Sequence, residues 1–297
     1  KYSIKSYQKG FEIDQIKIEI EVTRDMVWPI AYTLEEFKED YARHDFDPDT
    51  RLFCFFKNKM VGSILFSISP KNDDGVLEAF LYYPRVLPGY EETILLLIER
   101  AIEVMKKKGV KIARIRANTM WESSFEMIEK CGFKEHEVHK RGYKVYSVYD
   151  LEKGPLDVPT DSVEECTTDR EFEKCAELAV NWYNRPIDWV SNHMRKLFTP
   201  EFTIAHLYVQ EKNEFKAACA IAPNLTVKTI AAFYYIYAPE EKYLAPMVAK
   251  AISICIEKGY QTLLVDLISQ HRNYEHFYSQ LGFTKAAEWA YYEKQVQ

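Results

Sequence analysis

The chain has 297 residues, of which 47% are hydrophobic and 28% are charged, and its formal net charge is −6. This length is enough for two domains of ordinary size, each with its own buried core. The acidic balance without a dense basic surface argues against nucleic-acid binding, and the lack of an apolar run of about eighteen residues argues against a membrane span.

The cysteines and the first residues of the chain bear on its cellular compartment. The cysteines are scattered without CxxC pairs, which favours reduced thiols over disulfides or a zinc site. The first residues show no basic patch followed by a short apolar core, so we expect no signal peptide. We therefore expect a cytoplasmic protein without a membrane anchor. The cysteines are Cys54, Cys131, Cys166, Cys175, Cys219 and Cys255.

The first half of the chain predicts three strands, a helix, a further strand and a second helix. The strands read as short runs rich in apolar, β-branched and aromatic residues, and the first helix has apolar residues on one side only. A lysine run and a glycine end that helix, as suits its negative dipole end and a left-handed turn. The segments are 52–68 with a turn at 57–59, then 75–83, 94–109, 110–117 and a helical stretch closing at 132–133.

The second half repeats this order. Residues 101–133 and 251–283 align without gaps, and the pairs Ala-Ile, Lys-Gly and Gly-Phe coincide. Pro246 is expected to be the first residue of the long helix, where a missing N–H is tolerated. The segments are 202–222 with a turn at 212–213, then 228–237, 245–259, 260–267 and a helical stretch closing at 282–283.

The boundary between the halves is also visible. Residues 152–162 combine glycine, two prolines and acidic residues without any alternation, so they predict a linker between domains at 1–151 and 163–297. Capping boxes predict helix starts at Thr33 and Thr168. We therefore expect an α/β protein with a mixed sheet in each of two similar domains.

One short motif carries a resemblance. "HFYSQLGF" at 276–283 lies 150 positions after "EMIEKCGF" at 126–133, and both close the repeated pattern of strands and helices. This arrangement resembles the GNAT acyltransferase superfamily, here twice, over roughly 2–150 and 163–295. The resemblance implies a sheet that splays between its fourth and fifth strands, where acyl-CoA inserts. The expected donor is acetyl-CoA, and no metal is expected.

The diphosphate loop is where the sequence departs from the family. The family's glycine-rich loop precedes the long helix and offers backbone N–H groups to the diphosphate. Its place falls on 89–94 and 239–244, and neither segment matches, since each carries two glutamates. The resemblance then leaves a set of candidate donor-binding residues. They are Arg85, Gly89, Tyr235, Tyr237, Lys242 and Asn273.

The resemblance also implies candidate residues for the chemistry. Tyr278 stands where the family's tyrosine protonates the departing thiolate, whereas its counterpart Ile128 has no hydroxyl. Glu78 stands where many members have a strand-four base, and its counterpart is Ala231. His271 could bind the acceptor or carry protons. Each has a structural alternative: Tyr278 as a packing residue, Glu78 as an edge or solvent-facing residue, and His271 as a solvated histidine.

The acceptor side of the family is built by its first two helices, which here are aromatic. Their residues could line a pocket for an amine or an aromatic group, or could belong to the core. They are Trp28, Tyr32, Trp182, Tyr183 and Trp189.

Two functions remain open on these grounds. The leading hypothesis is acetyl transfer from acetyl-CoA to an amine of a small molecule or peptide, with the second half more suited to the chemistry. The alternative is a non-catalytic binding or scaffold protein that has lost CoA binding. The oligomeric state cannot be predicted.

The aspartates of "HDFDPDTR" resemble the start of a calcium loop. The positions that require glycine and glutamate are occupied by Thr50 and Phe56, so we do not expect a calcium site here.

Overall fold

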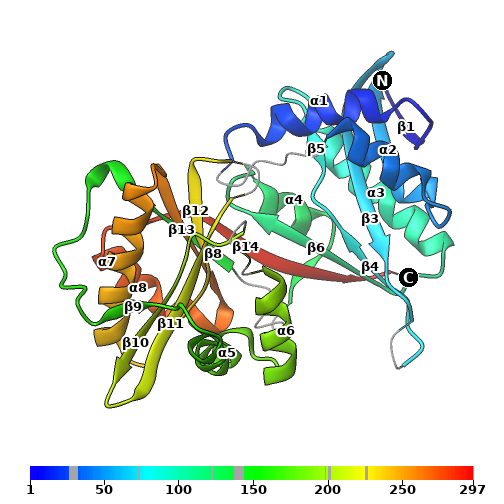
Figure 1. Ribbon diagram of the computed structural model, residues 1–297. Helices are drawn as coiled ribbons and strands as arrows, with labels where there is room; N and C mark the ends of the chain where they lie inside the picture. Colours follow the sequence, from blue (N-terminus) through cyan, green and yellow to red (C-terminus); the bar gives the residue numbers. More distant parts are fainter. Residues whose placement is uncertain are drawn as a thin grey trace. The chain divides into compact units, whose positions relative to one another are not determined.

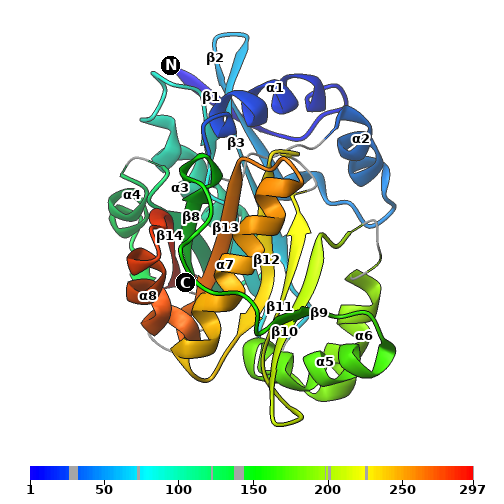
Figure 2. The same cartoon turned by 60° about the vertical axis from the view of Figure 1, so that its left-hand side comes forward.

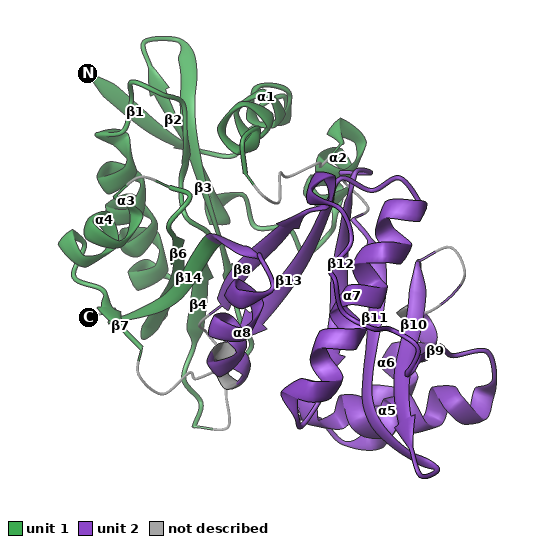
Figure 3. Cartoon of the chain, turned by 90° about the vertical axis from the view of Figure 1, so that its left-hand side faces the viewer, with its two compact units in different colours: residues 1–143, 287–297 green, residues 144–286 purple. Residues whose placement is uncertain are grey.

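The computed structural model divides the chain into two compact units, which we call unit 1 and unit 2. Unit 1 comprises Lys1–Tyr143 and Ala287–Gln297, and unit 2 comprises Lys144–Ala286 (Figure 3). The residues described are 1–26, 33–71, 74–121, 123–136, 144–197, 199, 202–224 and 227–296. Among them, no helix is both long and apolar enough to cross a bilayer.

Unit 1 is a mixed sheet with helices packed against it (Figure 1). Its strand order is β1-β2-β3-β4-β6-β14, and the pair β4 and β6 is parallel. β5 pairs with β3, and β7 pairs with β14. The strands are β1 Tyr2–Ser6, β2 Arg51–Phe56, β3 Lys59–Ile68, β4 Glu78–Leu81, β5 Arg85–Val86, β6 Ile112–Asn118, β7 Lys134–Glu135 and β14 Thr284–Gln295. The helices are α1 Glu12–Thr23, α2 Leu34–Ala42, α3 Thr93–Lys107, α4 Ser124–Lys130 and the 3-10 turn η1 Pro48–Thr50.

The core of unit 1 follows from the one-sided pattern of α3. Leu97, Ile98, Ala101 and Met105 recur at helical spacing and are fully buried. They belong to one cluster with residues of β2, β3, β4 and β6, and Ile128 on α4 is part of it. Burying an aliphatic side chain of this size contributes roughly 1.5–3 kcal/mol.

Unit 2 has the same plan. Its strand order is β8-β13-β12-β11-β10-β9, and the pair β12 and β13 is parallel. The strands are β8 Lys144–Asp150, β9 Val163–Glu165, β10 Ala205–Glu211, β11 Glu214–Pro223, β12 Ile230–Tyr237 and β13 Thr262–Ile268. The helices are α5 Asp169–Tyr183, α6 Ile187–Leu197, α7 Glu241–Glu257, α8 Glu275–Gln280 and the 3-10 turns η2 Leu151–Lys153 and η3 Ser269–Tyr274.

The two halves of the sequence exchange their last strands. β14, at the end of the chain, pairs antiparallel with β6 from Trp289↔Asn118 to Gln295↔Ile112, inside unit 1. β8 pairs antiparallel with β13 from Thr262↔Asp150 to Ile268↔Lys144, inside unit 2. The predicted linker at 152–162 stays a prediction of where the two similar halves join along the sequence. The compact units follow a different division, because each contains one strand from the other half.

Several local predictions are confirmed and one is wrong. Thr33 and Thr168 both form capping boxes, and the hairpin turns contain Lys57, Lys212 and Asn213 with positive φ. Pro246, however, is not the first helical residue: α7 begins at Glu241, so the proline lies inside the helix. It therefore has no N–H to donate to the carbonyl of Lys242 one turn earlier.

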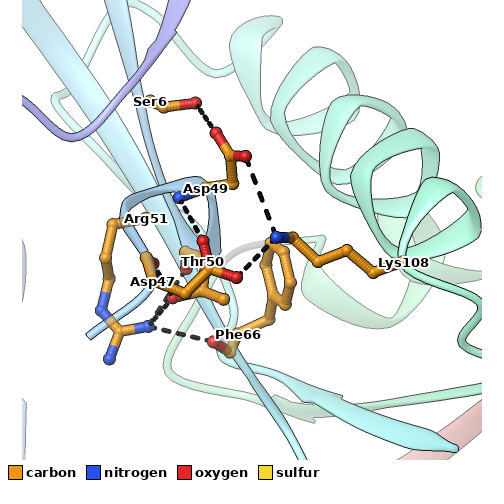
Figure 4. Close-up of polar contacts among 7 residues, drawn as sticks. All are labelled: Ser6, Asp47, Asp49, Thr50, Arg51, Phe66 and Lys108. Carbon is orange, nitrogen blue, oxygen red and sulfur yellow. Dashed lines mark hydrogen bonds and ion pairs between the residues drawn. The ribbon is translucent and has the colours of Figure 1, made fainter. Parts of the chain in front are cut away.

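A cluster of polar contacts fixes the turn before β2 (Figure 4). The Lys108 ammonium at the end of α3 lies 2.5 Å from Asp47 Oδ2 and 3.8 Å from Asp49 Oδ2. The Ser6 hydroxyl donates to Asp49 Oδ1 at 2.6 Å. The two aspartates that resembled a calcium loop therefore neutralise a lysine and tie η1 to α3.

Candidate functional site

The central feature of unit 2 is a parallel strand pair that parts. β12 and β13 are in register only from Ile230↔Thr262 to Ala232↔Leu264, although β12 continues to Tyr237 and β13 to Ile268. Figure 2 shows the two strands side by side with α7 in front of them. Beyond Ala232, the β12 backbone pairs with no residue of β13 among those that the structure describes. This leaves backbone donors and acceptors available at the point where the strands separate.

A β-bulge lies in the same stretch of β12. The pairing with β11 shifts between Ala220↔Tyr235 and Ile221↔Phe233, so Tyr234 is the extra residue. Tyr234 is 41% exposed, whereas Phe233 and Tyr235 on either side of it are buried. The bulge therefore presents one aromatic side chain to solvent beside the parting strands.

η3 and α8 each contribute a tyrosine, and the one on η3 contacts the residue that follows β12. Tyr278 is 1% exposed and packs edge-on against Phe277 and Phe283. Burial raises its pKa well above the ordinary value, and the nearby Cys219 and Tyr274 add to this effect. The Tyr274 hydroxyl donates to the Ala238 carbonyl, just past the end of β12, at 3.1 Å. Tyr274 thus links η3 to the end of β12.

Sequence reasoning missed Tyr274. Its counterpart 150 positions earlier is Ser124, whose hydroxyl bonds the Asn118 carbonyl at 2.6 Å. A comparison of the two halves residue by residue over 274–278 would have found it, because both tyrosines of unit 2 replace non-aromatic residues there.

Tyr235 and His271 are engaged within the core. The Tyr235 hydroxyl bonds His206 Nε2, and the tyrosine is fully buried. His271 is 6% exposed and stacks on Trp182 with ring centroids 4.1 Å apart. Burial lowers the pKa of His271, which keeps its imidazole neutral at physiological pH.

The remaining predicted donor-binding residues of unit 2 lie nearer the surface. Lys242, in the first turn of α7, pairs with Glu240 at 3.1 Å and lies over the Tyr243 ring at 4.5 Å. The Tyr243 hydrogen bond and then the Glu240 contact raise the pKa of Lys242 to about 12. Tyr237 ends β12 and is half-buried, and Asn273 in η3 is exposed. The first turn of α7 therefore places Lys242, paired with Glu240, beside the backbone N–H groups of a helix N-terminus, of which that of Tyr243 donates to the Glu240 carbonyl at 3.1 Å.

In unit 1, the corresponding loop is filled by its own carboxylates. The Gly89 N–H donates to Glu91 Oε1 at 2.8 Å. The next residue, Glu92, is the N-cap of α3, but its side chain makes no hydrogen bond to the helix. The Glu92 carboxylate instead accepts a hydrogen bond from the Tyr2 hydroxyl at 2.5 Å. The donor that a diphosphate would use is thus taken by a glutamate of the same loop.

Arg85 and Glu78 are both held in ion pairs. Arg85 is 9% exposed and its Nε lies 3.2 Å from Glu19 Oε2. Glu78, at the start of β4, lies 2.5 Å from Arg114 Nη1, and Arg114 also pairs with Glu293 at 3.0 Å. Glu78 forms the first pair of the β4–β6 ladder, with Ile112. It therefore lies at the opposite end of the ladder from the last pair, Leu81↔Ile115, after which β4 and β6 no longer pair.

The predicted acceptor residues fall into two groups. Trp182 is buried, whereas Trp189 is 44% exposed and stacks on His193 at 4.5 Å. Tyr183 packs edge-on against both of those rings. Trp28 and Tyr32 lie outside the described residues.

The catalytic and donor-binding candidates are divided between the two units. Unit 2 contains Tyr235, Tyr237, Lys242, His271, Asn273 and Tyr278, and unit 1 contains Glu78, Arg85 and Gly89.

Solved structures share this fold over the whole chain. A GCN5-related N-acetyltransferase from Sphaerobacter thermophilus matches with a TM-score of 0.65 at 10% identity, covering 100% of this chain and 96% of its own. A tandem GNAT protein from the clavulanic acid biosynthesis pathway matches at 0.62 and 12% identity, covering 100% and 99%. A GNAT-family acetyltransferase from Colwellia psychrerythraea matches at 0.59 and 14% identity, covering 99% and 100%.

No protein-family model and no curated protein sequence matches the chain. The structural likeness, together with the repeated order of elements and the parting parallel strands, is enough to assign the fold. The chain has the fold of a tandem GNAT protein, with one GNAT-like mixed sheet in each unit.

Proposed function

We propose that the protein is an acyl-CoA-dependent N-acyltransferase, that the acyl group is acetyl, and that unit 2 carries the reaction. The observation that supports this most is the separation of β12 from β13 after Ala232, which leaves the β12 edge available to an extended ligand arm. The first turn of α7 lies directly beyond that edge and suits a diphosphate through its backbone N–H groups and Lys242. The acceptor is an amine of a small molecule or peptide.

The reaction assigns one role to each buried group. The acceptor nitrogen attacks the thioester carbonyl, a C–N bond forms, and the C–S bond breaks. A β12 backbone N–H stabilises the developing oxyanion. Tyr278, which is protonated at neutral pH, gives its proton to the departing thiolate. His271, kept neutral by burial, takes the proton that the attacking amine loses.

Unit 1 has no such role in this proposal. Its Gly89 N–H is satisfied by Glu91, and the phenol of Tyr278 is replaced by the buried Ile128. Glu78, the strand-four carboxylate, is neutralised by Arg114. We therefore expect one donor site per chain rather than two.

The test measures binding and turnover separately. Calorimetry with acetyl-CoA and with CoA should give saturable binding of one ligand per chain, and a thiol-release assay over a panel of amines should give turnover. Tyr278→Phe should lower turnover about 10²–10⁴-fold, as expected for loss of a proton donor, with donor affinity unchanged. Tyr260→Phe is the matched control, since this phenol precedes β13 at the end away from the parting strands. Equal turnover in both variants would refute the role of Tyr278.

The alternative function is non-catalytic binding. It is favoured by one observation: each predicted loop contains two glutamates, and one of them, Glu91, already occupies a backbone donor. No calorimetric signal with acetyl-CoA or CoA at millimolar concentration would favour this alternative over the transferase.

A further inference from the structure

Unit 1 contains a small polar cavity that acyl transfer by unit 2 does not use. Its volume is about 220 Å³, below the range of roughly 300–1,000 Å³ found for drug-sized ligands. Residues of α1, α2, β2, β3 and the segment around β5 line it. Those that bear charge are Glu19, Asp40, Arg51 and Arg85. The cavity is therefore sized for a metabolite of a few heavy atoms and lined by both signs of charge.

Two of these charges neutralise each other. Arg85 Nε lies 3.2 Å from Glu19 Oε2, and the two side chains are 11% and 5% exposed. The Arg85 guanidinium also stacks on Trp121 at 4.4 Å. Such a pair is held in place by its surroundings, because separating two buried charges is costly. It supplies a rigid, neutral and polar wall.

Arg51 is different, because its partners are neutral. Its Nη1 donates to the Thr50 carbonyl at 3.1 Å, to Thr50 Oγ1 at 2.9 Å and to the Phe66 carbonyl at 3.0 Å (Figure 4). Its buried Nε has no hydrogen-bond partner among the described residues. Among the described residues, no carboxylate forms an ion pair with the Arg51 guanidinium. A guanidinium in this state is suited to a carboxylate, which it can bind through two N–H groups.

A buried amide lies behind the cavity wall, one hydrogen bond away from it. The Tyr41 hydroxyl, on the cavity wall, donates to Gln15 Oε1 at 2.6 Å, and Gln15 is fully buried. The amide nitrogen of Gln15 has no partner among the described residues.

Asp40 places a carboxylate on the cavity wall. It is an exposed residue of α2, and no ion pair holds its carboxylate among the residues that the structure describes. The cavity thus has a cation on β2 and an anion on α2, neither of which is held in an ion pair among the described residues, with a neutral pair beside them. A ligand with one carboxylate and one ammonium group matches both.

We propose that this cavity binds a small zwitterion of the α-amino acid class, with its carboxylate on Arg51 and its ammonium group toward Asp40. Binding here is not followed by transfer, because the donor loop of unit 1 is filled by Glu91. The proposal does not depend on acyl transfer by unit 2, and it is tested without CoA.

The experiment is a thermal-shift screen of the full-length protein with the common amino acids at millimolar concentration, followed by calorimetry on those that stabilise it. At least one should bind saturably. Arg51→Gln should weaken it about tenfold or more, as expected for loss of a charged hydrogen bond. Arg51→Lys should retain part of the affinity. Arg100→Gln is the matched control: this arginine pairs with Glu103 on α3 and does not line the cavity, so affinity should not change.

A second variant tests the ligand class. Asp40→Asn lies at an exposed position and should leave folding intact, while it weakens the amino acid and leaves the corresponding deaminated acid unaffected. The proposal is overturned if no amino acid binds the unmodified protein, if Arg51→Gln binds as tightly, or if the deaminated acid binds as well as the amino acid. Turnover by unit 2 is measured separately, so failure of one proposal is distinguishable from failure of the other.

Discussion

His206 on β10 should make unit 2 lose stability on acidification. The imidazole is 7% exposed, bonds the Tyr235 hydroxyl and packs edge-on against Phe172 at 5.7 Å. Burial lowers its pKa from 6.5 to about 4. Between these values the unfolded chain binds a proton at this histidine and the folded chain does not. Stability therefore falls as the pH is lowered from 6.5 toward 4.

The magnitude follows from the two pKa values. The difference between 6.5 and about 4 corresponds to about 3 kcal/mol, since each pKa unit is worth about 1.4 kcal/mol. Typical net stabilities are about 5–15 kcal/mol, so this is a substantial share for one side chain. Carboxylates titrate in the same range, so the share of His206 must be obtained by difference.

The assay is urea unfolding followed by circular dichroism at a series of pH values. His206→Gln removes the titration and keeps an amide that can bond the Tyr235 hydroxyl. The stability gap between the native protein and this variant should change by about 3 kcal/mol across the range. His276→Gln is the control, because His276 is exposed on α8 and bonds only Gln280 among the described residues. A gap for His206→Gln that stays constant with pH would refute the reasoning.

Three further predictions concern stability and are checked by the same denaturation at neutral pH. Arg85→Met should lower the free energy of unfolding by about 3–5 kcal/mol, because it leaves the Glu19 carboxylate buried and unpaired. Adding Glu19→Leu should recover most of this loss. A double variant whose loss equals the sum of the two single losses would contradict this. Gly62→Ala should cost about 1–3 kcal/mol, because the new methyl group would lie 2.9 Å from Val86 Cγ2 and 3.0 Å from the Arg85 carbonyl. Thr168→Ala should lower the free energy of unfolding by about 1 kcal/mol, because it removes the capping box of α5. An unchanged urea midpoint would disprove this.

The sequence predicted the local structure well because each signal was local. Thr33 and Thr168 satisfy nearby backbone donors, and Lys57 and Asn213 lie in tight hairpin turns. Pro246 was misplaced because a proline is tolerated beyond the first turn when tertiary packing holds the helix. Strand exchange could not be predicted, since an alternating pattern specifies a strand and its buried face but not its partner.

The candidate site was predicted only in part, for a similar reason. The place of Tyr278 on α8 could be read from a motif. The engagement of Arg85 by Glu19 and of Tyr235 by His206 depends on residues far away in the sequence, 66 and 29 positions respectively. Arg51 was not singled out, because nothing in its neighbourhood along the chain shows that its guanidinium lacks an anionic partner.

The exchange of β14 sets an order of events during synthesis. The last strand of unit 1 consists of residues 287–295, which follow the whole of unit 2 in the sequence, whereas the strands it completes are made first. Unit 1 must therefore wait with the β6 edge uncovered until the whole of unit 2 has been translated. Contacts that close so long a loop form slowly. Loss of residues 287–295 would accordingly damage unit 1, whose other strands all lie before unit 2 in the sequence.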